Sequence, residues 1–328
     1  MNPYAERTTL KPVYDKKRYH EELSKAIADY WYATIYAPVL AIVQAGKKNA
    51  RESLLVKEIN AGNIQYYKGC MVGKFNAKTS LILISLGGKW NKLKKGYEIS
   101  LSQLPMDARQ ALAQSNVRKT ETKKKIDQFL DEKSTEIGST FDFRNYFARV
   151  IDDLNKQFRQ TVSDKISVQE QVEEGIEEQL AQDYGQNLNL YINGWTEQAI
   201  FRLREKVSES VFDGFRSSAL IETIKGENGV SQRKAKFLAR QETSLLVSKY
   251  REFRYKDIGV TMYKWSTSHD ERVRHNPKGG DHKILDQKIF RFDDPPVVDR
   301  ATGRRANPGE DFNCRCVAIP ILVEGQNV

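Results

Sequence analysis

The sequence predicts an α+β fold: a mainly helical scaffold, a small basic antiparallel β insert and a compact C-terminal α+β module. Apolar residues recur at helical spacing through most of the region from Asp107 to Asp257. Short β-prone runs punctuated by glycine fill the region from Asn60 to Leu101. The stretch from Tyr263 to Pro320 combines an aromatic strand with turns. It holds three of the four histidines and two of the three cysteines.

The length of 328 residues allows two or three domains with sizeable cores. We expect residues 1–125 to form an N-terminal helical region that carries the basic insert at about 60–101. Residues 126–228 are expected to form a helical bundle, and residues 229–328 the C-terminal module. Three cysteines cannot all pair within one chain, which argues against a secreted disulfide scaffold.

The N-terminal region is expected to begin with a helix. Leu23, Ile27 and Trp31 recur at helical spacing, and Pro38 should break or restart the helix. The uncharged run from Tyr30 to Gly46 is shorter than the roughly 20 residues that a membrane helix needs. We therefore interpret it as a buried aromatic helix and expect no membrane contact. No signal peptide is evident.

The β insert is expected to be a small antiparallel sheet. Its predicted strands are Asn63–Tyr67, Met71–Phe75, Ser80–Ile84 and Tyr97–Leu101, separated by glycines. After it, Pro105 opens a new helix from its first turn.

Positive charge is concentrated in one segment of the chain. Residues 47–125 contain 17 basic and five acidic side chains, a net charge of +12, whereas the whole chain carries +10. Such a surface attracts a polyanion through counterion release, with little reading of bases. Trp90 and several tyrosines lie among these lysines and could stack on bases. We expect non-specific DNA contact, through Lys89, Lys92, Lys94, Lys95, Lys123, Lys124 and Lys125; the alternative is a solvated surface that only aids solubility.

The central region is expected to contain long helices. Phe143–Ile166 and Val168–Lys206 look like amphipathic helices, and Arg118–Lys125 is a charged link. Gly226–Gly229 should interrupt the helical run. A last helix, Gln232–Lys256, is expected after it, with Ser231 as its N-cap. Glu242 lies on the apolar face of that helix, where an unpaired charge is costly. We expect it to form a structural ion pair with Arg272 or Arg274; a catalytic carboxylate is the alternative.

The C-terminal module contains a candidate metal site. Trp265 is expected on a strand, and Cys314 and Cys316, two residues apart on a strand, would face the same side. A disulfide between them would close a small, strained ring. Zinc takes four soft or borderline ligands in a tetrahedron, so His275, His282, Cys314 and Cys316 could form a structural site. The alternatives are two reduced, partly buried cysteines or a Cys–His dyad oriented by Asp311 or Asn313.

The C-terminal residues also follow a recognisable order. The series is Arg240-Gln241-Glu242, Gly259, Tyr263-Lys264-Trp265, Ser268 to Arg274, His282 to Asp286, Pro308-Gly309 and Asn313 to Cys316. This order resembles the phage Mu F-like head-morphogenesis family, over roughly Gly226 to Leu322. Two positions depart from the family pattern. Gln287 replaces the usual glycine after Leu-Asp, and histidines stand where many relatives carry a Cys-x-x-Cys pair near His275.

The resemblance implies a non-enzymatic minor head protein of a tailed bacteriophage or prophage. Such a protein lies in the capsid interior or near the portal, and in the host cytoplasm during assembly. Its implied partners are the portal protein or the major capsid protein, and its implied roles are head assembly, genome packaging or DNA ejection. The alternative is a metal-dependent hydrolase or nuclease built from His275, His282, Glu242 and the cysteines, which would lose activity without Glu242.

Overall fold

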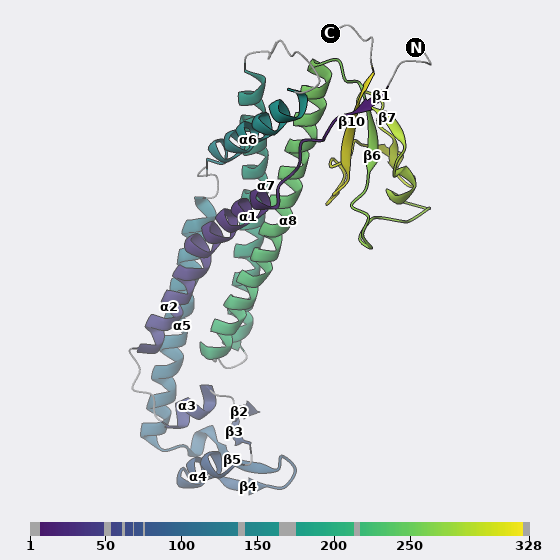
Figure 1. Cartoon of the computed structure of the whole chain (residues 1–328). Coiled ribbons are helices and arrows are strands. Elements are labelled where there is room, and N and C mark those ends of the chain that lie inside the picture. The colour runs from purple at the N-terminus through teal and green to yellow at the C-terminus, as the bar shows by residue number, and fades with distance from the viewer. Residues whose placement is uncertain are drawn as a thin grey trace. The chain divides into compact units, whose positions relative to one another are not determined.

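The computed structural model describes residues 7–48, 54–60, 63–67, 69–74, 76–136, 142–163, 175–212 and 217–323 (Figure 1). The chain divides into two compact units, each built from segments that are not consecutive in the sequence. Unit 1 comprises residues 1–28, 140–192 and 232–328, and unit 2 comprises residues 29–139 and 193–231. The structure is 62% helix and 15% strand, the strands lying in small antiparallel sheets, which confirms the predicted α+β class.

The helices are α1 (Lys17–Trp31), the π-helix η1 (Tyr32–Tyr36), α2 (Ala37–Lys48), α3 (Leu54–Asn60), α4 (Ala77–Ser85), the 3-10 turn η2 (Leu101–Gln103), α5 (Met106–Thr135), α6 (Arg144–Val162), α7 (Ile176–Phe212), α8 (Ser217–Asp257) and the 3-10 turn η3 (Lys283–Leu285). The strands are β1 (Arg7–Thr9), β2 (Ile64–Tyr67), β3 (Cys70–Gly73), β4 (Lys89–Asn91), β5 (Gly96–Ser100), β6 (Met262–Ser266), β7 (Ile289–Arg291), β8 (Val297–Asp299), β9 (Arg304–Arg305) and β10 (Val317–Val323).

In unit 1, aromatic residues join the helices to one another. Phe147 of α6 packs on Tyr184 of α7, and Phe158 of α6 packs on Tyr255 of α8, with ring centroids 6.0 and 5.6 Å apart. Tyr255 also stacks on Phe292, at 6.3 Å. Burial of these large rings stabilises the unit and attaches the C-terminal module to the end of α8.

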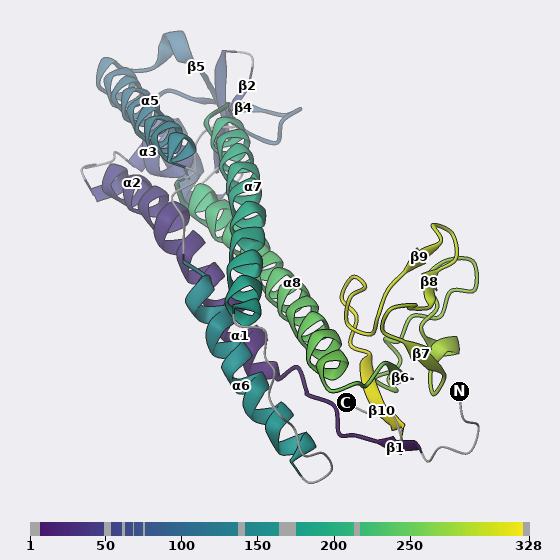
Figure 2. The same cartoon turned by 90° about the horizontal axis from the view of Figure 1, so that it is seen from above.

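The C-terminal module is built on a four-stranded antiparallel sheet with the order β1-β10-β6-β7 (Figure 2). The predicted strand around Trp265 is confirmed as β6, where Trp265 pairs with Ala318 of β10. The N-terminal strand β1 pairs with the other edge of β10. The prediction that Cys314 and Cys316 lie on a strand is wrong. They lie in the loop that leads into β10. The sheet therefore positions this loop beside the C-terminal half of α8.

Unit 2 contains the region around Pro38, which does not break the helix. The missing N–H of a proline removes one i→i−4 hydrogen bond. The chain absorbs this in η1, where the Ala37 N–H bonds to Tyr32 O, five residues back. Trp31 then packs on Trp195 at 6.2 Å and donates its indole N–H to Thr196 Oγ1 over 3.0 Å.

The predicted antiparallel insert is present in unit 2 as a sheet with the order β2-β3-β5-β4. Three of its predicted strands are confirmed as β2, β3 and β5, and β4 was not predicted. The predicted strand Ser80–Ile84 is wrong, because the segment belongs to helix α4. Asn76 caps that helix by accepting from the Thr79 N–H over 2.8 Å, and Leu83 buries its apolar face.

Two further helix boundaries differ from prediction. Gly226 and Gly229 lie inside α8, and Arg118–Lys125 lies inside α5. Glycine in a helix costs about 1 kcal/mol, which packing can override. Here Leu220 and Ile224 are buried, and Ser231, the predicted N-cap, instead bonds to Tyr36 Oη over 2.6 Å. The predicted helix start at Val168 lies outside the described residues.

One helical stretch, Lys17–Ala45, is long and apolar enough to cross a membrane by length and composition. A core helix of a soluble protein passes the same test. Ile35, Tyr36 and Val39 are fully buried, and 33% of the apolar window is buried in all.

Candidate metal centre

The loop of residues 307–316 is anchored on α8. Ser248 Oγ donates to Pro308 O over 3.0 Å, and Gln241 Oε1 accepts from the Asn313 N–H over 2.6 Å. Gly309 has φ +96, and a Cβ there would lie 3.4 Å from Ser244 O and Ser248 Cβ. The turn therefore favours glycine because of its backbone angle.

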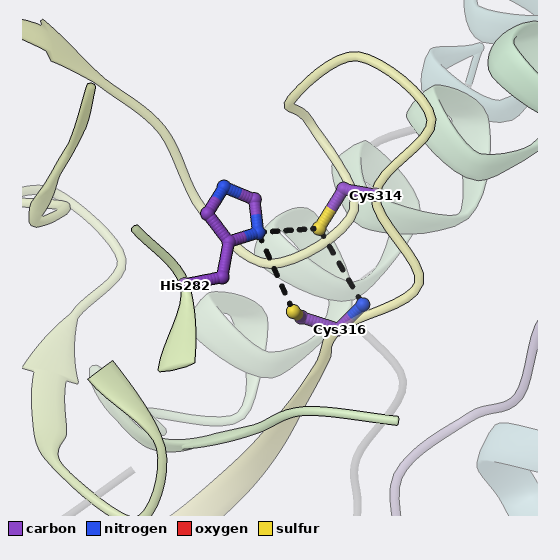
Figure 3. Close-up of side chains that lie close together, drawn as sticks. All are labelled: His282, Cys314 and Cys316. Atoms are coloured by element: carbon purple, nitrogen blue, oxygen red, sulfur yellow. Dashed lines mark hydrogen bonds between the residues drawn. The ribbon is translucent and has the colours of Figure 1, made fainter. Parts of the chain in front are cut away.

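This anchoring brings the two cysteines to one side of His282 (Figure 3). Cys314 Sγ and Cys316 Sγ each lie 3.6 Å from His282 Nδ1. The Cys316 N–H also donates to Cys314 Sγ over 3.4 Å. All three side chains are buried, and their donor atoms lie within 4.8 Å of one another. The cysteines are free thiols.

These distances match those between ligands of a tetrahedral zinc ion. With Zn–N near 2.0–2.1 Å and Zn–S near 2.3 Å, tetrahedral geometry places a nitrogen and a sulfur ligand about 3.6 Å apart. Both sulfurs meet this condition with the same nitrogen atom, Nδ1 of His282. A Cys–His dyad needs only one thiol at the imidazole, so a metal explains the arrangement of the second cysteine better.

Asp311 holds the other side of the imidazole. Its Oδ2 lies 2.9 Å from His282 Nε2, and its carboxylate is completely buried. Arg274 pairs with the same oxygen, and Arg304 lies 2.6 Å from Oδ1. The carboxylate is therefore neutralised and fixed, and it directs Nδ1 of His282 toward the sulfurs. Carboxylates play this role behind many metal-binding histidines.

The proton affinities of the cluster follow from these contacts. Burial alone would lower the pKa of His282, but hydrogen bonds to Asp311 and Cys314 raise it to about 9. Hydrogen bonds from Cys316 and His282 hold the pKa of Cys314 well below its usual range, against the effect of burial. The hydrogen bond to Cys314, together with burial, raises the pKa of Cys316. These contacts thus favour ionisation of Cys314 over Cys316 and protonation of His282.

His275, the fourth predicted ligand, does not join the cluster. Its side chain is 53% exposed, and its Nδ1 lies 3.1 Å from Asp281 Oδ1. The two residues form an antiparallel bridge, His275 with Asp281, that turns this side chain away. The four-ligand His₂Cys₂ set therefore reduces to three ligands among the described residues.

The predicted ion pair of Glu242 with Arg272 or Arg274 is also not formed. Glu242 is 1% exposed and accepts from Asn187 Nδ2 over 2.9 Å. Burial raises its pKa, against the effect of that hydrogen bond. Arg274 pairs with Asp311 instead, and Arg272 is exposed. Glu242 is therefore a buried carboxyl group bonded to an amide, outside the His–Cys cluster, which removes it from the predicted hydrolase site.

The predicted DNA-contacting lysines lie on two elements of unit 2. Lys89, Lys92, Lys94 and Lys95 belong to the β4–β5 hairpin, and Lys123, Lys124 and Lys125 to the middle of α5. Lys94 Nζ lies 2.6 Å from Glu98, and Lys123 pairs with Asp127. The other five lysines of the set are exposed. The helix and the hairpin therefore carry separate groups of positive charge.

Sequence reasoning missed the residues that assemble the centre. Asp311 entered only as a possible partner of a catalytic histidine, whereas it orients His282 and binds two arginines. Gln241 entered only as part of the family series and Ser248 not at all, yet they fix the cysteine loop. Their spacing of seven residues, two helical turns, was the available signal for a shared face.

Comparison with known proteins adds an independent finding. The family model described as "Phage Mu protein F like protein" matches residues 202–319. An uncharacterized protein of Haemophilus influenzae is 31% identical over 131 residues, which cover 40% of this chain and 27% of the relative. No solved structure matches the chain. The match includes the end of α7, all of α8 and nearly all of the C-terminal module. The predicted resemblance is thus confirmed: residues 202–319 match the phage Mu F-like family.

Proposed function

We propose that this chain is a minor head protein of a tailed phage or prophage. In this role it docks on the portal protein or the major capsid protein. It supports head morphogenesis and genome packaging or DNA ejection, and it contacts DNA without sequence preference. It resides in the virion, within the capsid or near the portal. The proposed role involves neither turnover nor membrane attachment.

The observation that carries the DNA contact is the β4–β5 hairpin. Lys89, Lys92 and Lys95 are exposed on it, together with Trp90, which is 43% exposed, and Leu93, which is 96% exposed. Lysines neutralise phosphates, and an aromatic ring offers a stacking surface to any base. The hairpin belongs to the segment with a net charge of +12, and its one acidic residue, Glu98, pairs with Lys94.

The DNA contact is tested by a triple variant, Lys89→Gln/Lys92→Gln/Lys95→Gln, measured by fluorescence anisotropy on a short duplex at several salt concentrations. Three lost phosphate contacts should lower the slope of log K against log salt by about 3. The matched control is Lys278→Gln/Lys283→Gln/Lys288→Gln. It removes the same charge from exposed positions of unit 1 and should change the slope little. If both variants change the slope equally, the DNA binding would reflect the net charge of the protein and not a contact made by the hairpin.

Docking is tested by co-expression with the portal and major capsid proteins of the same phage, followed by affinity purification and analysis of purified heads. A minor head protein should co-purify with one of these two partners and should be present in few copies per head. Its absence from purified heads, with assembly unaffected by its deletion, would contradict the proposal. Binding to the portal alone or to the capsid protein alone would identify the docking partner.

A further inference from the structure

The His282–Cys314–Cys316 cluster has the chemistry of a zinc site and lacks one ligand. Two thiolates with an imidazole favour zinc over the hard cations magnesium and calcium. Zinc takes four ligands, and among the described residues only these three side chains form such a group. The ring of Trp265 packs edge-on against His282 at 5.5 Å. Trp265 is completely buried, so an aromatic ring closes the site on this side.

On the side of the cysteines, the cluster borders a cavity. The cavity has a volume of about 230 Å³ and is lined by Cys314, Cys316, Asp15, His20, Ser244 and Arg251, among others. Asp15 is already held by His20, at 2.8 Å, and by Ser244 Oγ, also at 2.8 Å. The Asp15 carboxylate is thus already bonded to two other residues that line the cavity.

Arg251 contributes a buried positive charge to the lining of this cavity. It is 3% exposed, and its Nε donates to Val13 O over 2.7 Å. Its Nη2 is buried without a hydrogen-bond partner among the described residues. A buried guanidinium donor without an acceptor is costly, and an anion in the cavity would satisfy it.

We propose that His282, Cys314 and Cys316 bind one zinc ion, and that its fourth ligand is a water molecule or small anion drawn from the cavity lined by Arg251. Nδ1 of His282 and the two thiolates are the protein ligands, and Asp311 orients the imidazole. Zinc with two thiolates is electrically neutral, so an anionic fourth ligand would carry the charge that Arg251 balances. The inference is independent of the proposed role in the phage head.

The zinc is tested first by elemental mass spectrometry of the full-length protein after reconstitution with zinc and removal of excess metal. The expected result is about one zinc per chain. Absence of zinc in the folded wild-type protein would overturn the proposal.

Variants then assign the ligands. Cys314→Ser, Cys316→Ser and His282→Ala should each lose zinc, whereas Cys70→Ser and His275→Ala should keep it. Cys70 lies in unit 2 and His275 is outside the cluster, so they are matched controls for the cysteine and histidine changes. Circular dichroism checks that each variant is folded. Zinc retained by a folded Cys314→Ser/Cys316→Ser protein would overturn the assignment, as would zinc lost from His275→Ala.

The open position is tested with cobalt in place of zinc. Visible absorption of the cobalt protein should show the intense bands of a tetrahedral thiolate site, and titration with azide should shift them with saturation. Arg251→Gln should weaken azide binding by about tenfold or more, because it removes the buried cation. A spectrum that azide leaves unchanged would overturn the open fourth position. The assignment of the three protein ligands would still be decided by the zinc content of the variants.

Discussion

Asp311 Oδ2 lies 2.9 Å from His282 Nε2, and the opposite ring nitrogen of His282 lies 3.6 Å from both cysteine sulfurs. One buried carboxylate thus determines which imidazole nitrogen faces the thiols. The orientation of His282 therefore depends on a contact with a residue 29 positions away in the sequence.

Replacing Asp311 should therefore weaken metal binding without removing a ligand. Asp311→Asn is expected to lower zinc affinity by about 10–100-fold, as measured by competition with a chromophoric chelator. Asp293→Asn is the control, since Asp293 is an exposed partner of Arg291 in the same module. An unchanged affinity in folded Asp311→Asn protein would contradict the orienting role of the carboxylate.

Glu242→Gln should stabilise the protein at neutral pH. Burial raises the pKa of Glu242, so the folded state binds a proton more readily than the unfolded state. The unfolding free energy of the wild type should fall as pH rises above about 4.5, the ordinary value. The variant cannot ionise there and should gain on the order of 1 kcal/mol at pH 7. Urea unfolding at pH 4 and pH 7 measures this; a variant less stable at both pH values would contradict it.

Asp153→Asn should destabilise unit 1 and weaken its response to acid. Burial would raise the pKa of Asp153, but hydrogen bonds from Lys16, Tyr19 and Arg18 lower it to about 2. Its contribution is therefore present above about pH 3.8 and is lost as the pH falls toward 2. The variant should lose about 2 kcal/mol at pH 7 in urea unfolding.

The control for this change is the neighbouring residue. Asp152 is 65% exposed and pairs with Lys156 within the same helix. Asp152→Asn should change the unfolding free energy by less than about 0.5 kcal/mol. Similar losses in the two variants would mean that the contacts of the N-terminal segment with Asp153 contribute little.

Trp90→Ala should weaken binding to single-stranded DNA by about 1–3 kcal/mol, because the ring offers a stacking surface. The salt dependence should stay the same, since no charge is removed. Leu93→Ala is the control: Leu93 is the more exposed apolar residue of the same hairpin, but it has no ring to stack. Equal losses in both variants, measured by fluorescence anisotropy, would indicate general apolar contact instead of stacking.

Several elements followed from local sequence signals. The strands of the insert and the strand around Trp265 were predicted because glycines and alternating residues mark them. Ser80–Ile84 misled the prediction, because its β-branched and leucine residues favour a strand, whereas the Asn76 cap and the burial of Leu83 decide for a helix. Gly226 and Gly229 misled it in the same way, because packing outweighs the cost of glycine within α8.

The candidate site shows the same division. Cys314, Cys316 and His282 could be chosen from the sequence because metal-binding residue types are scarce in this chain and crowd into one stretch. His275 was chosen for the same reason and was wrong, because its direction depends on the bridge to Asp281. Glu242 was correctly expected to be buried, but its partner, Asn187, lies on another helix.

The sequence by itself determined the helical periodicity, the concentration of positive charge, the family resemblance and the residue types that could bind metal. These are properties of composition and local spacing, which need no knowledge of distant contacts. The tertiary structure decided the partners: Asp311 for His282, Asn187 for Glu242 and Arg251 for the cavity. A partner is set by the direction of a side chain and by the desolvation of its neighbours. Both arise only when segments far apart in the chain are packed together.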